Sequence, residues 1–143
     1  MTRGELDRDV IRRHLLMLRE ALANLRRHAG CSAQELRDDS DLRWTVERGL
    51  QLCAQNVLDI ATHLAAAAGL DAPDYTTAID RLAELAVVPA AFAARLRPIA
   101  GFRNVLVHGY LQVDLGVLER VLHDRLGEME EFAVCVDAYL ARA

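Results

Sequence analysis

Four side chains with different chemistry lie within eight residues, Arg103 to Tyr110, in the segment RNVLVHGY. Arg103 offers a planar guanidinium that matches phosphate oxygens and stays charged at any physiological pH. His108 carries an imidazole, whose reference pKa of about 6.5 allows it to accept or donate a proton near neutral pH. Asn104 and Tyr110 add an amide and a phenol. This set could stabilise a phosphorane-like transition state and move the protons that phosphodiester chemistry requires.

The spacing of these residues sets how they can meet. On a continuous helix the step from Arg103 to Tyr110 is roughly 700°, about 20° short of two turns, so both lie on one face. His108 would lie roughly 140° from Arg103. Gly109 is a natural helix terminator, and we expect it to free His108 and Tyr110 to turn inwards. A single imidazole must act as acid or base, or alternate, whereas a homodimer could bring two copies to one cleft.

A structural role is the alternative for the same cluster. Near a helix end, an arginine, a histidine and a tyrosine can serve as a dipole partner, a satisfied polar residue and an amphipathic surface aromatic. The net charge of -4 also lacks the basic footprint of proteins that hold long nucleic acids by phosphate contacts. Any contact with a nucleic acid is therefore expected to be local.

The rest of the chain predicts helices that could position this cluster. Hydrophobic residues make up 52% of the 143 residues, and Ala, Leu and Arg dominate, which favours one all-α domain over residues 1–143. Apolar residues at alternating spacings of three and four predict a helix from Leu6 to about His28. The same pattern predicts a helix from a cap at Ser40 or Asp41 to Gly69, and another from a cap at Asp114 through residue 140.

Shorter elements complete the prediction. A third helix should open at Pro73, with Thr77 and Asp80 as a variant capping box, and run to about residue 87. A fourth should start at Pro89 and kink or restart at Pro98, with its second piece running from residue 99 to about 108. The stretch 30–39 is the longest connection and is expected to be mobile. Together these elements predict an up-down antiparallel bundle of about five helices.

The sequence gives little support for a metal, a cofactor or a membrane anchor. The three cysteines are widely spaced, and we expect them to be buried, reduced thiols. The remaining histidines have no second ligand at helical spacing beyond common carboxylates, so no metal site is expected; they are His14, His28, His63 and His123. A charged N-terminus and the absence of a long apolar run predict a cytoplasmic protein.

Several residues outside the cluster have two possible roles. His63 could approach the cluster across the bundle or could be packed and hydrogen-bonded. Trp44 could stack on a base or pack at a helix or dimer interface. Arg95 and Arg97 precede Arg103 on the same predicted element and either widen its positive patch or serve elsewhere.

The pattern Arg-x-x-x-x-His-x-Tyr, after one helix and before a final long one, resembles the signature of the HEPN superfamily as it occurs in HepT-type toxins. The resemblance extends to the run RWTVERGLQLCAQNVLDIATHLA over 43–65, to the segment DYTTAIDRLAEL, and to RNVLVHGYLQVD over 103–114. These blocks cover most of the chain from about residue 41 onward. They imply a HEPN-like helical bundle.

The resemblance also implies a function. It implies the toxin component of a type VII HEPN/MNT toxin-antitoxin system, a homodimeric, metal-independent endoribonuclease that needs no cofactor. Arg103 and His108 occupy the catalytic positions of the family, and Asn104 matches the polar residue that often follows the arginine. Tyr110 matches the tyrosine that a cognate MntA-type nucleotidyltransferase antitoxin modifies with AMP. Such a modification would add bulk and negative charge where RNA phosphate must bind.

Two other functions fit the same sequence. One is a catalytically inactive HEPN-like subunit that binds or scaffolds a nucleotidyltransferase partner, and the other is a helical bundle with no role in RNA chemistry. The enzyme differs from both because replacing Arg103 or His108 with alanine should abolish RNA cleavage while the fold persists.

Overall fold

Helices account for all the regular secondary structure in this computed structural model, which describes residues 5–109 and 113–143. Within these ranges there are eight helices and no strand, so the predicted all-α class is confirmed. The helices are α1 (Arg8–Arg26), α2 (Ala33–Asp38), α3 (Ser40–Ala67), α4 (Tyr75–Glu84), α5 (Ala90–Leu96), α6 (Pro98–His108), α7 (Leu115–Asp124) and α8 (Leu126–Arg142).

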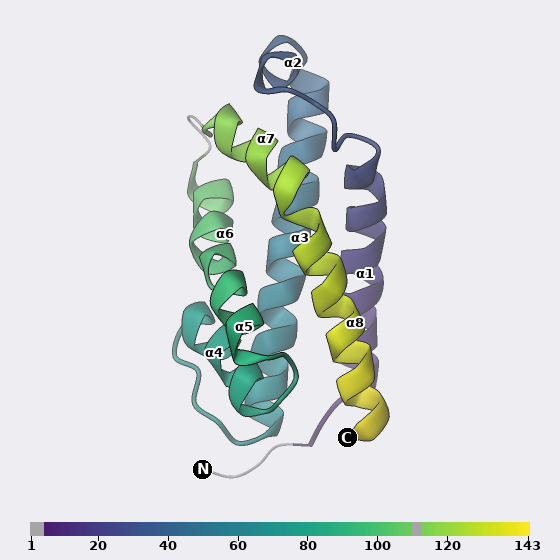
Figure 1. Cartoon of the computed structure of the whole chain (residues 1–143), viewed down its shortest axis with the longest axis vertical. Coiled ribbons are helices and arrows are strands. Elements are labelled where there is room, and N and C mark those ends of the chain that lie inside the picture. Colours follow the sequence, from purple (N-terminus) through teal and green to yellow (C-terminus); the bar gives the residue numbers. More distant parts are fainter. Residues whose placement is uncertain (1–4, 110–112) are drawn as a thin grey trace.

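The long helices run alternately up and down. Helix α3 is the longest and lies at the centre, with α1 beside it on one side and α6 on the other (Figure 1). Helices α7 and α8 follow one another down the near face, while the short helices α4 and α5 fill the end of the bundle where α3 finishes (Figure 1). This arrangement confirms the expected up-down bundle, and it leaves α6 along one flank of α3.

The core forms where the predicted apolar stripes meet. All five stripe residues of α1 are at most 2% exposed, namely Ile11, Leu15, Leu18, Leu22 and Leu25. The stripe of α3 is equally buried and lies against them. A glycine brings the two helices close, because a Cβ added to Gly49 would lie only 2.7 Å from Cδ2 of Leu25. Burial on this scale supplies the main favourable free energy of folding.

The stretch 30–39 is more ordered in structure than expected. It contains helix α2, which a capping box begins: Ser32 accepts the backbone N–H of Glu35, and Glu35 accepts the N–H of Ser32. Leu36 anchors this helix and is fully buried. Asp39 both ends α2 and caps α3 by accepting the N–H of Leu42. The predicted caps Ser40 and Asp41 are therefore wrong by one or two residues.

Helix α4 also begins at a different cap from the one expected. The carboxylate of Asp74 accepts the backbone N–H of Thr77 at 2.7 Å, and the predicted pairing of Thr77 with Asp80 is wrong. That hydrogen bond stabilises the ionised form and lowers the pKa of Asp74 from its ordinary value of 3.8. Asp80 instead pairs with Arg97.

The helix restart predicted at Pro98 is confirmed, whereas the prediction of one continuous final helix from Asp114 through residue 140 is wrong. Helix α5 ends at Leu96 and α6 restarts with Pro98 at its first position, where the missing N–H costs no intrahelical hydrogen bond. Asp114 caps α7 as expected. The last helix is broken at Arg125, whose φ of -112° departs from helical geometry, so α7 and α8 are separate. With α2 and the two breaks, the described chain has eight helices where about five were expected.

The cysteines are unpaired, and only one of them is deeply buried. Cys53 lies fully within the core, where burial raises the pKa of its thiol to about 12. Cys31 and Cys135 are half-buried. Across residues 5–109 and 113–143, none of the helices combines the length and the apolar character that a membrane crossing requires.

Candidate active site

Arg103 lies on the second turn of α6, on the side that faces α3 and α4. Its Nε donates to Oε1 of Gln55 on α3 at 2.8 Å, and its Nη1 donates to Oδ1 of Asn104 at 3.0 Å. The Cζ atom of the guanidinium lies 5.5 Å from the centre of the Tyr75 ring on α4, within cation–π range. Three helices thus hold one half-buried cation in place.

Gln55 is itself held in one orientation. Its Nε2 donates to Oδ1 of Asp59 at 2.8 Å and to the hydroxyl of Tyr75 at 3.3 Å. The amide oxygen is therefore left facing the guanidinium of Arg103. Gln55 separates this cation from the nearest carboxylate of the network, so Asp59 stabilises the amide without neutralising the arginine.

The acceptors bound to Arg103 are neutral, and this is the electrostatic basis of the site. Within the described ranges, its two hydrogen-bond partners are amide oxygens, and no ion pair with a carboxylate is present. A guanidinium has five N–H donors, so fixing it with two hydrogen bonds leaves donors for an incoming anion. Beside it, Asn104 and Tyr75 line a hollow of about 400 Å³ between α4 and α6.

His108 is the last residue of α6, and its side chain is exposed. The backbone N–H of Gly109 bonds to the carbonyl of Val105 at 2.7 Å, so the chain stays helical through His108. The two side chains therefore keep a separation of roughly 140° around the helix. In the part of the subunit that the structure describes, no hydrogen bond joins His108 to Arg103. Tyr110, the fourth member of the predicted cluster, lies outside the described residues.

A wide groove lies at the end of α6 that carries His108. It has a volume of about 1010 Å³, and its lining includes Trp44, Arg37 and Arg43 on one side and Leu106 and Gly109 on the other. The Trp44 side chain is 63% exposed. Trp44 is therefore not packed into the core of its own chain, and its ring remains accessible to a base or to a second subunit.

Arg95 and Arg97 do not join Arg103. The guanidinium of Arg95 lies 5.1 Å from the ring centre of Phe92, and its side chain borders a cavity between α6 and the α7–α8 segment. Arg97 pairs with Asp80 on α4 at 3.0 Å. Of the two roles weighed for these arginines, the structure supports roles away from the Arg103 site.

His63 lies beside another histidine, and among the described residues no hydrogen bond joins it to the cluster on α6. Its ring centre lies 5.6 Å from that of His14 on α1. The Nδ1 of His14 is 2.8 Å from Oδ1 of the buried Asn56, which fixes the imidazole ring. His14 and Asn56 line a shallow groove that also reaches Gln55. Among the residues with described positions, no three potential metal ligands gather closely enough to hold an ion.

The sequence analysis missed the residues that orient Arg103. Gln55, Asp59 and Tyr75 come from α3 and α4, far from Arg103 along the chain. Their only signal was polar character beside an apolar stripe, which is typical of any helix surface. All three lie within the two upstream blocks whose sequence resembles HepT-type toxins.

The arrangement of these helices, with Arg103 and His108 on the helix before the final α7–α8 segment, defines the class of protein. It is an α-helical bundle similar in fold to a solved HEPN toxin. The chain belongs to the family described as Ribonuclease HepT-like, whose family model matches residues 4–136.

Individual proteins support the same assignment. The chain is 24% identical over 131 residues to the mRNA nuclease HepT of Shewanella oneidensis, covering 91% of this chain and 98% of that protein. The fold is similar to the cytosolic protein YutE of Bacillus subtilis, with a TM-score of 0.83, 21% identity, and coverage of 97% and 94% of the two chains. It is also similar to the tri-AMPylated HEPN toxin of Shewanella oneidensis, solved in complex with an MNT antitoxin, with a TM-score of 0.80, 21% identity, and coverage of 92% and 99%.

Proposed function

We propose that this chain is a metal-independent endoribonuclease, the toxin of a HEPN/MNT pair, with Arg103 and His108 as its catalytic residues. The observation that carries the proposal is the state of Arg103, a half-buried cation oriented by Gln55, Asn104 and the Tyr75 ring and bonded only to neutral oxygens in the described chain. A guanidinium fixed in this way is prepared for an anion, because its charge is kept and its orientation is already set.

The reaction follows from the chemistry of these side chains. The ribose 2'-oxygen attacks the adjacent phosphorus as it loses its proton, the bond from phosphorus to the 5'-oxygen breaks, and that oxygen gains a proton. The products are a 2',3'-cyclic phosphate and a 5'-hydroxyl. Arg103 stabilises the extra negative charge on the phosphorane-like transition state, and His108 transfers a proton. Asn104 positions the guanidinium through its 3.0 Å hydrogen bond.

A homodimer supplies what one subunit lacks. His108 points away from Arg103 within its own chain and is exposed at the end of α6. Packing of two subunits at the end of α6 that carries His108 would bring both imidazoles and both guanidinium groups towards one cleft. One imidazole then acts as base and the other as acid.

The groove beside Gly109 is suited to the flanking RNA. Trp44 presents an exposed ring on which a base can stack, and Arg37 and Arg43 lie beside it in a lining that also holds Glu47 and Asp114. These few cations are compatible with the net acidic charge of the chain, because they act within one groove.

Tyr110 is the proposed control point, and the proposed partner is a minimal nucleotidyltransferase. The phenol oxygen attacks the α-phosphorus of ATP, pyrophosphate leaves, and the phenolic proton is lost. The attached AMP places a negative phosphate two residues from His108, where it repels the RNA backbone. The related toxin of Shewanella oneidensis is described as tri-AMPylated and in complex with an MNT antitoxin, which supports this partner and this modification.

The test is RNA cleavage in the presence of EDTA by the wild type, Arg103→Ala and His108→Ala, with Arg12→Ala on the far helix α1 as the matched control. We expect the wild type and the control to cleave and the two site variants to lose at least about a hundredfold in rate. The intact mass after incubation with the partner and ATP should rise by whole AMP units, and Tyr110→Phe should abolish the increase. A wild type that binds the partner and cleaves no RNA would instead identify a scaffold subunit.

A further inference from the structure

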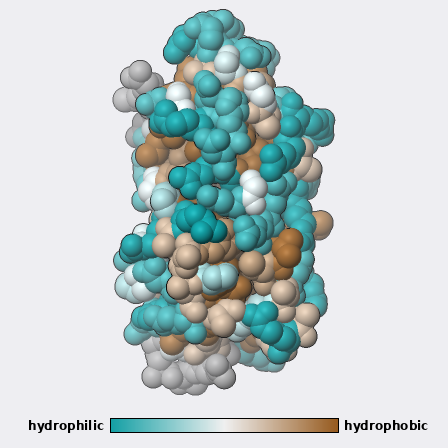
Figure 2. Space-filling model, in the orientation of Figure 1, coloured by the Kyte–Doolittle hydropathy of each residue, from teal (hydrophilic) through white to brown (hydrophobic). Residues whose placement is uncertain are grey.

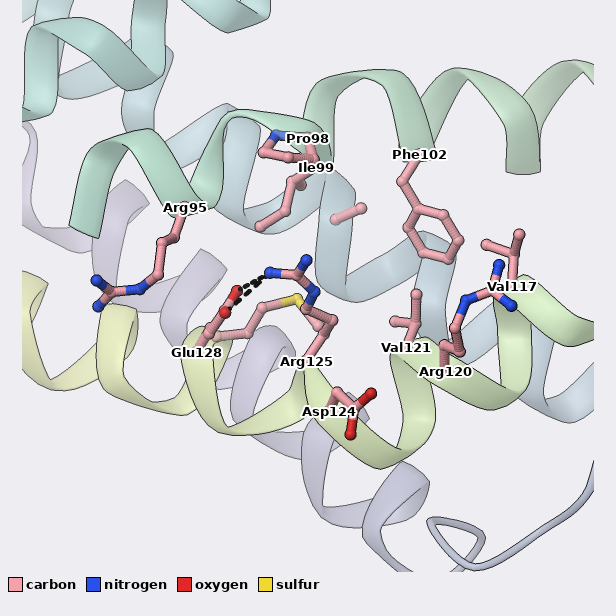
Figure 3. A pocket seen from close by; sticks show the side chains of 12 residues that line it. Arg95, Pro98, Ile99, Phe102, Val117, Arg120, Val121, Asp124, Arg125 and Glu128 are labelled. Carbon is pink, nitrogen blue, oxygen red and sulfur yellow. Dashed lines mark hydrogen bonds and ion pairs between the residues drawn. The ribbon is translucent and has the colours of Figure 1, made fainter. Parts of the chain in front are cut away.

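A further cavity lies on the side of α6 that faces α7 and α8. It has a volume of about 310 Å³ and lies between α5 and α6 on one side and α7 and α8 on the other (Figure 3). Its walls are apolar, with Ile99 and Phe102 from α6 and Val117, Val121 and Met129 opposite them. None of the candidate catalytic residues lines it. Its volume is at the lower end of the range for small-molecule sites, about 300–1,000 Å³.

The rim of this cavity carries more positive than negative charge. Arg95, Arg120 and Arg125 border it, together with Asp124 and Glu128. Arg125 is bound to Glu128 by two hydrogen bonds of 2.9 and 3.2 Å, drawn as dashed lines in Figure 3.

Arg120 is the cation available to a ligand. It lies beside Val117 (Figure 3), and a Cβ added to Gly116, one turn earlier on α7, would lie 3.6 Å from its Nη1. In the described ranges it takes part in none of the hydrogen bonds or ion pairs, whereas Arg95 lies against the Phe92 ring. Asp124 lies below Arg125 and Val121 in this view, on the side away from Ile99 and Phe102 (Figure 3).

The cavity marks a weak point in the packing of α6. This helix packs along α3 and touches α4, and Ala100, at 7% exposed, is its one buried residue. Ile99 and Phe102 are half-buried because the cavity separates them from α7 and α8. Apolar side chains gather on this face over α5 and the neighbouring part of α8 (Figure 2). A molecule in the cavity would therefore complete the packing of the helix that carries Arg103.

We propose that this cavity binds a small organic anion, with an apolar body between Phe102, Ile99 and Val121 and a carboxylate on Arg120. An apolar body suits the apolar walls, and a carboxylate accepts the paired donors of a guanidinium. A bound ligand stabilises the position of α6, because Phe102 precedes Arg103 on the same helix. The site does not depend on the ribonuclease proposal, since its occupancy can be measured without RNA.

In the test, each of three probes is added to the purified full chain, and binding is measured by the changes in chemical shift of the backbone amide resonances. The probes are octanoate, its neutral counterpart 1-octanol, and inorganic phosphate. We expect octanoate to shift resonances of α6 and α7 with a sub-millimolar dissociation constant and to slow amide hydrogen exchange in α6. Octanol should bind the same region about tenfold more weakly, and phosphate should cause no saturable shift there.

Arg120→Gln gives the decisive comparison, because its side chain is exposed and the fold should persist. It should weaken octanoate about tenfold and leave octanol unchanged, while Arg12→Gln on α1 should change neither. Val121→Phe, which fills the cavity, should abolish binding of both organic probes. Equal affinity for octanoate and octanol, an unaltered affinity in Arg120→Gln, or shifts confined to another surface would each overturn the proposal.

Discussion

Replacing Gln55 with leucine removes the acceptor that faces Nε of Arg103 and leaves a side chain of similar size. The change also removes the hydrogen bonds to Asp59 and to the Tyr75 hydroxyl. A hydrogen bond to a charged group contributes roughly 1.5–3 kcal/mol. Because Arg103 is half-buried and its hydrogen bond is partly replaced by water in the variant, the lower value of about 1.5 kcal/mol applies.

The rate falls because a guanidinium that has lost its positioning hydrogen bond stabilises the transition state less well. A loss of about 1.4 kcal/mol in transition-state stabilisation lowers kcat/KM roughly tenfold. The folded state loses a similar amount, about 1 kcal/mol, which corresponds to a melting temperature lower by roughly 3–5 °C for a chain of this size. Gln55→Leu should therefore cleave RNA about ten times more slowly at a temperature where it is fully folded.

The assay compares initial cleavage rates of a short fluorescent RNA with melting curves of the same preparations. Gln51→Leu is the matched control, since it makes the same change one turn earlier on α3 at a residue outside the network described for Gln55. Tyr75→Phe keeps the ring over Arg103 and removes only the long 3.3 Å hydrogen bond, so its rate should stay near that of the wild type. The reasoning is refuted if Gln55→Leu and Gln51→Leu cleave at the same rate.

Three further predictions concern the fold. Asp74→Ala should lower the melting temperature at pH 7. Because the pKa of Asp74 is lowered in the folded state, only the ionised carboxylate stabilises the fold, and the difference in melting temperature from the wild type should shrink as the pH falls below 3.8. An unchanged difference at pH 3 would contradict this. A thiol-reactive disulfide reagent at pH 8 should label Cys31 and Cys135 in the native protein and Cys53 only after unfolding. The reason is that burial shields Cys53 and raises the pKa of its thiol to about 12. Rapid labelling of all three cysteines would contradict this and show that the core opens. Ala86, just after helix α4, has a φ of 57°, a left-handed conformation that costs about 1–2 kcal/mol for a residue other than glycine. Ala86→Gly should therefore raise the free energy of unfolding, measured in urea, by about 0.5–1 kcal/mol. A decrease would contradict this.

The long elements were predictable because their signals are local and repeated. Every apolar stripe residue expected on α1 is buried, and the restart at Pro98 and the cap at Asp114 follow from the chemistry of single residues. Helix α2 carried a local signal too, the Ser32–Glu35 capping box. It was overlooked because its six residues contain one buried anchor, Leu36, and one anchor makes no periodicity.

Other features depend on tertiary structure. Leu118, Leu122, Leu126 and Met129 keep helical spacing across the break at Arg125, so periodicity gives no sign that α7 and α8 are separate. In the site, Arg103 was identifiable from its type and its place in the motif. Gln55 and Tyr75 meet it only because α3 and α4 pack against α6, and no spacing along the chain encodes that meeting.

The most direct test of the central proposal, one RNA cleft shared by two subunits, is the activity of a mixed dimer. Arg103→Ala and His108→Ala subunits, each with a different affinity tag, are co-expressed, and dimers that carry both tags are isolated and assayed for RNA cleavage. If the cleft is shared, the mixed dimer retains one guanidinium and one imidazole from opposite subunits and should cleave faster than either variant homodimer. A mixed dimer no faster than the two homodimers, although it forms and melts normally, would contradict the shared cleft.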